Sequence, residues 1–270
     1  MQIEALVLAY EPLIRFSIFL GLFAVVALWE LWAPRRALTV SKPLRWGSNL
    51  AMVVLNTVVV RLLFPLTEVG VAALCAAQGW GLLNYFALPL AWAVPVAVVA
   101  LDLAIWAQHV TTHHVPWLWR LHRVHHADLD YDLTTGSRFH PLEIVLSMLL
   151  KFTAIAALGA PVLAVVLFEV LLSSAAMFNH GNIRLPLALD RVLRWVIVTP
   201  DMHRVHHSAH MDEANRNFGF NLPWWDRLFG TYRSQPRAGH EGMVIGLHGH
   251  SALREVARLD GMLALPFKSP

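Results

Sequence analysis

Two copies of the pattern H-x-x-H-H stand about eighty residues apart in a chain whose remaining sequence is mostly apolar, and an H-x-x-x-H pair precedes them. On a helix, offsets of three and four residues bring side chains to one face, so each triplet can aim at one point. Imidazole is the commonest neutral metal ligand, and a tetrahedral zinc ion uses only four ligands. The pattern therefore predicts a two-metal site. Its histidines are His109, His113, His122, His125, His126, His203, His206 and His207.

Other polar residues near these boxes are candidates for the same site. His140 and His180 lie between the boxes and are predicted as further ligands. Asp102 shares a helical stripe with His109, and a carboxylate in a membrane helix is a functional candidate by default, so it is predicted to orient a ligand imidazole. Glu143 is either the partner of His140 or an acid at a helix start, and Asn182 is predicted to hydrogen-bond a ligand.

The composition is that of a polytopic membrane protein. Of the 270 residues, 57% are hydrophobic and 14% charged, against about 25% charged in soluble domains. Apolar spans are expected over residues 13–32, 49–71 and 85–106, each near the ~20 residues that cross a bilayer. Residues 144–177 should form a hairpin broken at Gly159–Pro161, each half short for a full crossing. The predicted fold is all-α: membrane helices with a cytoplasmic, histidine-rich helical cap.

The distribution of basic residues predicts the orientation. Arg35, Arg36, Lys42 and Arg45 follow the first span, so this loop should be cytoplasmic. The later spans then bring every histidine to the cytoplasmic side of the membrane, which would be the inner membrane in a bacterium. We divide the chain into a transmembrane anchor (1–84), a catalytic domain (85–235) and a C-terminal tail (236–270).

Several kinds of redox site are excluded. Cys75 is the single cysteine, so neither an intrachain disulfide nor a cysteine-ligated iron–sulfur cluster can form. The sequence contains no G-x-G-x-x-G motif after a predicted strand. Electrons for any redox chemistry must therefore come from another protein. The net charge of +3 is explained by the cytoplasmic flanks of membrane helices and does not indicate nucleic-acid binding.

The stretches WAQHVTTHHVPWLWRLHRVHHADLDYDLTTGSRFHPLE, FNHGN and TPDMHRVHHSAHMDEANRNFGFNLPWWDRLFGTY resemble the fatty acid hydroxylase superfamily, also called the sterol desaturase family. The resemblance covers roughly residues 95–235. It implies a membrane-bound enzyme with two iron ions, held by the histidines of the boxes together with His109, His113, His180 and His140. It also implies hydroxylation or desaturation of a lipid with O2 and two reducing equivalents.

The functional prediction is therefore an O2-dependent di-iron lipid hydroxylase or desaturase. Its electron donor should be separate, a ferredoxin or cytochrome with a reductase, docking on arginines of the cap that include Arg123, Arg194 and Arg204. The alternative is a non-enzymatic metal-binding membrane protein, either a zinc-stabilised scaffold or a transporter. The residues alone do not choose the metal, since zinc, copper and iron all accept imidazole.

Overall fold

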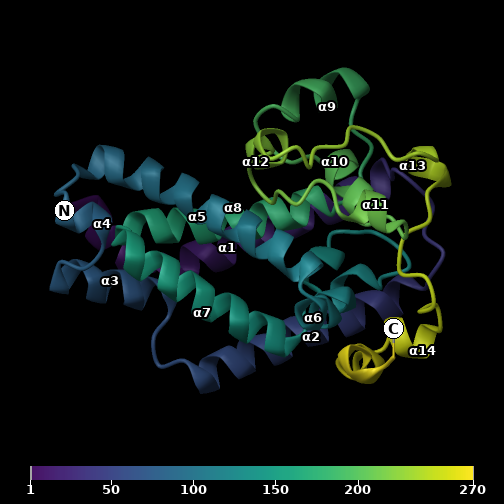
Figure 1. Cartoon of the computed structure of the whole chain (residues 1–270), viewed down its shortest axis with the longest axis horizontal. Helices are drawn as coiled ribbons and strands as arrows, with labels where there is room; N and C mark the ends of the chain where they lie inside the picture. The colour runs from purple at the N-terminus through teal and green to yellow at the C-terminus, as the bar shows by residue number, and fades with distance from the viewer. Residues whose placement is uncertain (1, 270) are drawn as a thin grey trace.

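The computed structural model describes residues 2–269, with side chains from residue 9 onward. The regular elements in this range are all helices, and β-pairing there is limited to isolated bridges such as Pro34 with Ile183. Long helices fill one end of the molecule, and short helices and loops form a cap at the other (Figure 1). The N-terminus lies at the end of the long helices and the C-terminus lies in the cap. The predicted all-α membrane architecture is confirmed.

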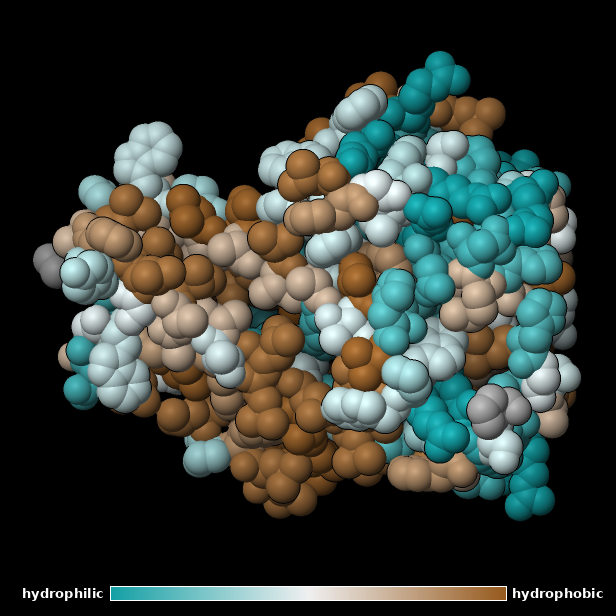
Figure 2. Space-filling model, viewed as in Figure 1, coloured by the Kyte–Doolittle hydropathy of each residue, from teal (hydrophilic) through white to brown (hydrophobic). Residues whose placement is uncertain are grey.

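Five segments are long and apolar enough to cross a membrane. They are Ala9–Trp32 within α1 (Gln2–Trp32), Lys42–Tyr85, and the helices α5 (Leu90–His114), α7 (Pro141–Leu158) and α8 (Val162–Asn179). Their exposed surface is strongly apolar (Figure 2). Each of α7 and α8 has 18 residues, about 27 Å of helix, which approaches the ~30 Å thickness of a hydrocarbon core. The hairpin is thus longer in each half than the sequence predicted.

The second predicted span, residues 49–71, is not one helix. The segment Lys42–Tyr85 contains α2 (Lys42–Leu63), α3 (Glu68–Gln78) and α4 (Leu82–Tyr85). The break lies at Pro65, which has no N–H to continue the helical ladder. Thr67 then caps α3, its hydroxyl accepting a hydrogen bond from the Gly70 N–H at 3.2 Å.

The predicted turn of the α7–α8 hairpin lies where expected and packs closely on the α3–α4 turn. Gly159 ends α7 with φ of 64°, a left-handed conformation that favours glycine. A Cβ atom on Gly81 would lie 2.0 Å from the Gly159 nitrogen. The two turns can therefore approach this closely only because residue 81 is glycine.

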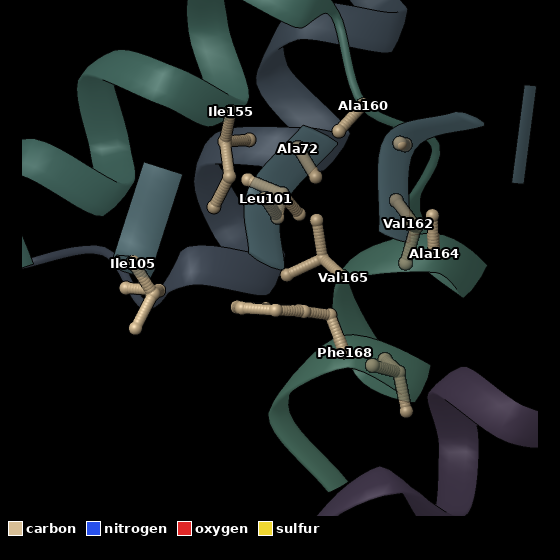
Figure 3. Packing of buried hydrophobic residues seen from close by; sticks show 11 residues of the cluster. Ala72, Leu101, Ile105, Ile155, Ala160, Val162, Ala164, Val165 and Phe168 are labelled. Carbon is tan, nitrogen blue, oxygen red and sulfur yellow. The ribbon is translucent and has the colours of Figure 1, made fainter. Parts of the chain in front are cut away.

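A core of small and branched residues joins the membrane helices (Figure 3). Ala72 of α3, Leu101 of α5, Ile155 of α7 and Val165 of α8 are fully buried in one cluster. Small side chains let membrane helices approach closely and gain van der Waals contact. This core fixes α5 against the hairpin, and α5 carries the first two histidines of the candidate site.

Charged groups inside the helical bundle are paired. The Lys151 ammonium on α7 lies 2.5 Å from the Glu68 carboxylate of α3 and 3.0 Å from the Glu169 carboxylate of α8. Arg15 of α1 pairs with Glu11 at 2.7 Å and lies 3.8 Å from Glu169. The network links four helices around one polar cluster, and this pairing lowers the cost of charges within membrane helices.

The cap is built from short elements. Its helices are α6 (Pro116–His126), η1 (Thr135–Ser137), α9 (Leu187–Leu193), α10 (Pro200–His206), α11 (Met211–Ala214), α12 (Trp224–Leu228), α13 (Gly239–Gly242), α14 (Leu253–Val256), α15 (Leu259–Ala264) and η2 (Leu265–Phe267). The region predicted as a tail packs on α6, where the Arg123 guanidinium donates to the carbonyls of Leu265 and Lys268 at 2.6 and 2.7 Å.

A buried ion-pair network ties the cap to the membrane helices. Arg45 of α2 donates to Asp128 at 2.8 and 2.7 Å and to Asp132 at 2.5 Å. All three side chains are at most 2% exposed. Burial raises the pKa of Asp128, but Arg45 and Arg138 hold it well below its ordinary value. The loop that follows the first histidine box is therefore fixed to α2.

Replacing Arg45 with Met should leave the buried Asp132 carboxylate without its cation and leave Asp128 with Arg138 alone, whose Nη1 atom lies 3.8 Å away. Breaking one side of a buried ion pair costs about 3–5 kcal/mol, and the free energy of unfolding in detergent should fall by that amount. Arg61→Met, on the exposed part of the same helix, is the matched control and should change it little. Equal stability of both variants would contradict the role given to Arg45.

Candidate metal centre

Nine buried histidines form two adjacent groups. The ring nitrogens within each group lie within 4.8 Å of one another. One group has five members and the other has four. The first contains His109, His113, His122, His126 and His206, and the second contains His125, His180, His203 and His207.

Each histidine box divides between the two groups, which the sequence did not predict. In the first box, His122 and His126 belong to one group and His125 to the other; in the second, His203 and His207 share a group and His206 joins the opposite one. Residues four apart on a helix differ by about 40°, whereas adjacent residues differ by about 100°. Each triplet therefore points at two places.

Facing Nε2 atoms have the separation of ligands on one metal ion. His109 Nε2 lies 3.0 Å from the Nε2 atoms of both His122 and His206. In the second group, His180 Nε2 lies 3.2 Å from the Nε2 atoms of His125 and His207. Two nitrogens at the usual metal–imidazole distance of about 2.0–2.1 Å would be about 2.9–3.4 Å apart for octahedral or tetrahedral angles.

The outer nitrogens fix the direction of the inner lone pairs. His109 Nδ1 lies 2.7 Å from the Phe218 carbonyl, His206 Nδ1 is 2.8 Å from the Arg216 carbonyl, and His180 Nδ1 is 2.8 Å from the Ala176 carbonyl. A carbonyl only accepts, so Nδ1 carries the proton and Nε2 a lone pair. Lone pairs of two rings face each other at about 3 Å, and a bound cation removes their repulsion. The donor set therefore fits metal ions.

Burial keeps the rings of His180, His203 and His206 neutral. It lowers the pKa of His180 and His206 to about 3. Burial, reinforced by neighbouring imidazoles, also lowers the pKa of His203 well below its ordinary value. Neither nitrogen of His203 has a hydrogen-bond partner among the described residues, although the side chain is fully buried. Such an unpartnered buried donor set is expected where a metal ion is the missing partner.

Glu143 contacts a histidine of the first group, but not the histidine predicted as its partner. Its carboxylate oxygen lies 2.5 Å from Nδ1 of His122, the arrangement in which a carboxylate orients a ligating imidazole. His140, the partner considered from sequence, lies in neither group. It caps α7, its Nδ1 accepting from the Leu142 N–H at 3.2 Å, and its Nε2 is 3.3 Å from the Leu263 carbonyl.

Asp102 and Asn182 form hydrogen bonds with residues other than the histidines of the two groups. Asp102 accepts hydrogen bonds from Trp225 and Asn221, both at 2.8 Å. It therefore ties α5 to the segment after the second box. Asn182 exchanges hydrogen bonds with the backbone of Arg36, at 3.1 and 2.8 Å, and so holds the loop after α1 against the end of α8.

Residues that sequence reasoning missed lie after the second box. The Asn215 side chain lies 3.1 Å from Nδ1 of His113. Asp226 accepts from the N–H groups of Phe218 and Gly219 at 2.9 and 2.8 Å and thereby positions the Phe218 carbonyl. Burial raises the pKa of Asp226. The sequence signal for them was the polar segment NRNFGFN at residues 215–221. Spacing along the chain does not specify which distant residues such a segment contacts.

Three arginines predicted to face an electron donor are buried. Arg204 is fully buried, pairs with Asp201 and donates to the Gly181 carbonyl at 3.2 Å. Arg123 is held by the carbonyls described above, and Arg194 is also buried. The predicted docking face is thus wrong at these positions, because backbone carbonyls and aspartates inside the cap bind these guanidinium groups.

A cavity of about 230 Å³ adjoins the first histidine group. His109, His122 and Glu143 line it at one end, and Lys151 and Glu169 also line it. Lys151 lies eight residues beyond Glu143 on α7, about 12 Å of helix. A second, mainly apolar groove between α5 and α7 shares Gln108, Thr112 and Glu143 with this cavity. The groove therefore adjoins the cavity at these three residues.

Comparison with known proteins agrees with this geometry. The family described as fatty acid hydroxylase matches residues 94–231. The ornithine lipid hydroxylase OlsE of Rhizobium tropici is 29% identical over 174 residues, 63% of this chain and 50% of that protein. The alkylglycerol monooxygenase of Homo sapiens is 28% identical over 173 residues, 61% of this chain and 36% of that protein.

A third relative, the cholesterol 25-hydroxylase of Rattus norvegicus, is 25% identical over 148 residues, 54% of this chain and 48% of that protein. The chain thus spans half or less of the length of these curated relatives. No solved structure matches the chain.

Replacing Glu143 with Gln should weaken metal retention about 10–100-fold, the usual effect of losing a partner that orients a ligand. The measurement is a competition titration with a chelator, with metal loss followed by absorption. Glu241→Gln, at an exposed position of the cap, should retain metal like the unmodified protein. If E143Q also titrates like the unmodified protein, Glu143 has no such role.

Proposed function

Because the chain belongs to the fatty acid hydroxylase family, an oxidoreductase family of lipid hydroxylases and monooxygenases, we propose that it is a membrane-bound di-iron oxygenase that hydroxylates or desaturates a lipid. The observation that carries this proposal is the pair of buried histidine groups beside a cavity that adjoins an apolar groove between the membrane helices α5 and α7. The nine histidines of the two groups would hold the metals. When bound, two iron ions supply the activation of O2 and the oxidation of a C–H bond.

The chain itself supplies position and the exclusion of water. The carbonyls of Phe218, Arg216 and Ala176 keep the ligand rings in one tautomer, and Glu143 orients His122. Phe139 stacks on His125 with ring centroids 4.5 Å apart, which closes one side of the centre. A site with fixed histidine rings and little water protects a reactive centre from solvent.

The groove between α5 and α7 is the proposed route for the lipid. It is lined mainly by alanine and leucine side chains such as Ala104, Ala107 and Leu146. The Ser147 hydroxyl donates to Gln108 Oε1 at 3.2 Å where groove and cavity meet. An acyl chain or sterol entering from the bilayer would pass this pair before reaching His109.

The alternative is a protein in which zinc only stabilises the fold. A structural zinc site is closed and saturated by four protein ligands. Here the first group has five histidines, and two of its rings line an open cavity. This arrangement favours the enzyme.

Metal content tests the assignment of the ligands. The purified protein should hold two metal ions per chain, measured by plasma mass spectrometry. His206→Ala and His125→Ala, one from each group, should each lower that content. His140→Ala removes a histidine outside both groups and should retain both ions. Full occupancy in H206A and H125A would contradict the ligand assignment.

Turnover tests the proposed activity. In lipid vesicles with a reductase and a ferredoxin or cytochrome donor, O2 consumption should accompany a lipid product that gains one oxygen atom or loses two hydrogens. Ala104→Trp in the groove should lower turnover roughly tenfold or more while metal content is unchanged, since misplaced substrate reacts slowly. The control is Leu149→Trp, which faces outward from α7. Oxidation with NADPH and O2 alone would contradict the need for a separate donor.

We also propose that the cap and the metal centre are cytoplasmic, on the basis of Arg35 and Arg36 beside the first span. A cysteine added at exposed Ser41, directly before α2, or at exposed Ser251 of the cap should react with an impermeant thiol reagent from the cytoplasmic side. A cysteine at exposed Gln78, at the other end of the helices, should react from the opposite side. The native Cys75 is buried and serves as the background. Labelling of positions 41 and 78 from one side would refute this orientation.

A further inference from the structure

The cap carries an exposed apolar surface away from the metal centre, which we call the α9–α12 patch. It consists of Leu187, Leu189, Val192, Trp195, Val196, Trp224, Leu228 and Phe229, which are 46–70% exposed. The elements α9 and α12 extend sideways from the cap beside the membrane helices (Figure 1). Apolar surface continues from those helices onto the neighbouring edge of the cap in Figure 2. Patches of this kind mark contact with a membrane or a partner.

An arginine-lined pocket of about 380 Å³ opens within this patch. Arg191, Arg194 and Arg227 line it, and Asp190 is the one acidic residue among its described lining residues. Asp190 pairs with Arg194 Nε at 2.7 Å, which leaves two positive charges in excess. The pocket therefore has the charge to accept an anion.

The guanidinium groups are held in place but not saturated. Arg227 lies between the rings of Trp195 and Tyr232, its Cζ atom 4.0 Å from each centroid. Arg194, only 5% exposed, donates to the Ser234 carbonyl at 2.5 Å. Nη2 of Arg194 and Nε of Arg227 are buried and have no hydrogen-bond partner in the part of the chain that the structure describes. Buried donors without partners indicate a missing acceptor.

We propose that this pocket binds the phosphate of an anionic lipid headgroup and anchors the cap to the bilayer surface. Phosphate offers several acceptor oxygens to arginine donors. Exposed tryptophans beside basic residues are typical of the membrane–water interface, and the adjoining apolar side chains would contact the acyl region of the same leaflet. Two sources of phosphate share this chemistry, a lipid headgroup and free phosphate, and the α9–α12 patch favours the lipid.

The test uses the full, delipidated protein in a neutral detergent, with thermal unfolding followed as ligand is added. Dihexanoyl phosphatidylglycerol should raise the unfolding midpoint saturably, and inorganic phosphate at the same concentration should not. Each arginine near an anionic headgroup contributes about fivefold in affinity. Arg191→Gln should thus weaken the apparent affinity about fivefold, and the double variant R191Q/R227Q about 30-fold.

Arg191 is exposed, so R191Q tests the proposal even if the double variant fails to fold. Arg254→Gln, an 85% exposed arginine of α14 elsewhere on the cap, is the charge-matched control and should bind lipid like the unmodified protein. An unchanged lipid affinity in R191Q, or an equal loss in R254Q, would overturn the site. An effect of inorganic phosphate equal to that of the lipid would overturn the assignment to a headgroup. None of these readouts depends on bound metal or turnover.

Discussion

The structure depends on one constraint, the convergence of imidazole lone pairs at two adjacent points. His109 Nε2 lies 3.0 Å from two other Nε2 atoms, and protons on the outer nitrogens prevent these rings from hydrogen-bonding one another. Such an arrangement is unfavourable in a buried site unless a cation lies between the rings. The rest of the fold holds nine rings in this arrangement, and that is the strongest physical reason to assign metal ions to the centre.

The arrangement of the membrane helices makes this convergence possible. α5 and α8 reach the cap from the same bundle and deliver His109, His113 and His180 at their ends, while the short helices α6 and α10 add the boxes. The Arg45 ion pairs and the Asp226 hydrogen bonds fix the loops between these elements. Stability and function are thus joined, since loosening the cap would move the ligand rings.

Spacing along the chain predicted that the box histidines would gather, but it did not predict their partition, and His140, also predicted as a ligand, lies in neither group. The i,i+3 and i,i+4 offsets identified the box histidines, and Gly159–Pro161 marked the turn between α7 and α8. The same offsets did not predict that His125 and His206 would cross to opposite groups, which depends on how α6 and α10 face each other. The partners of Glu143, Asp102 and Arg204 likewise come from contacts between distant segments. Local periodicity carries no information on such contacts.

Iron K-edge X-ray absorption on the iron-loaded protein tests the central claim most directly. The account predicts an inner coordination shell dominated by nitrogen, with the multiple-scattering pattern of imidazole, and its weakening in the variant His203→Ala. That ring belongs to the second group, and its nitrogens have no hydrogen-bond partner among the described residues, so the account makes it a ligand of one metal ion. An inner shell dominated by carboxylate oxygen, or a spectrum unchanged in the variant, would contradict the account.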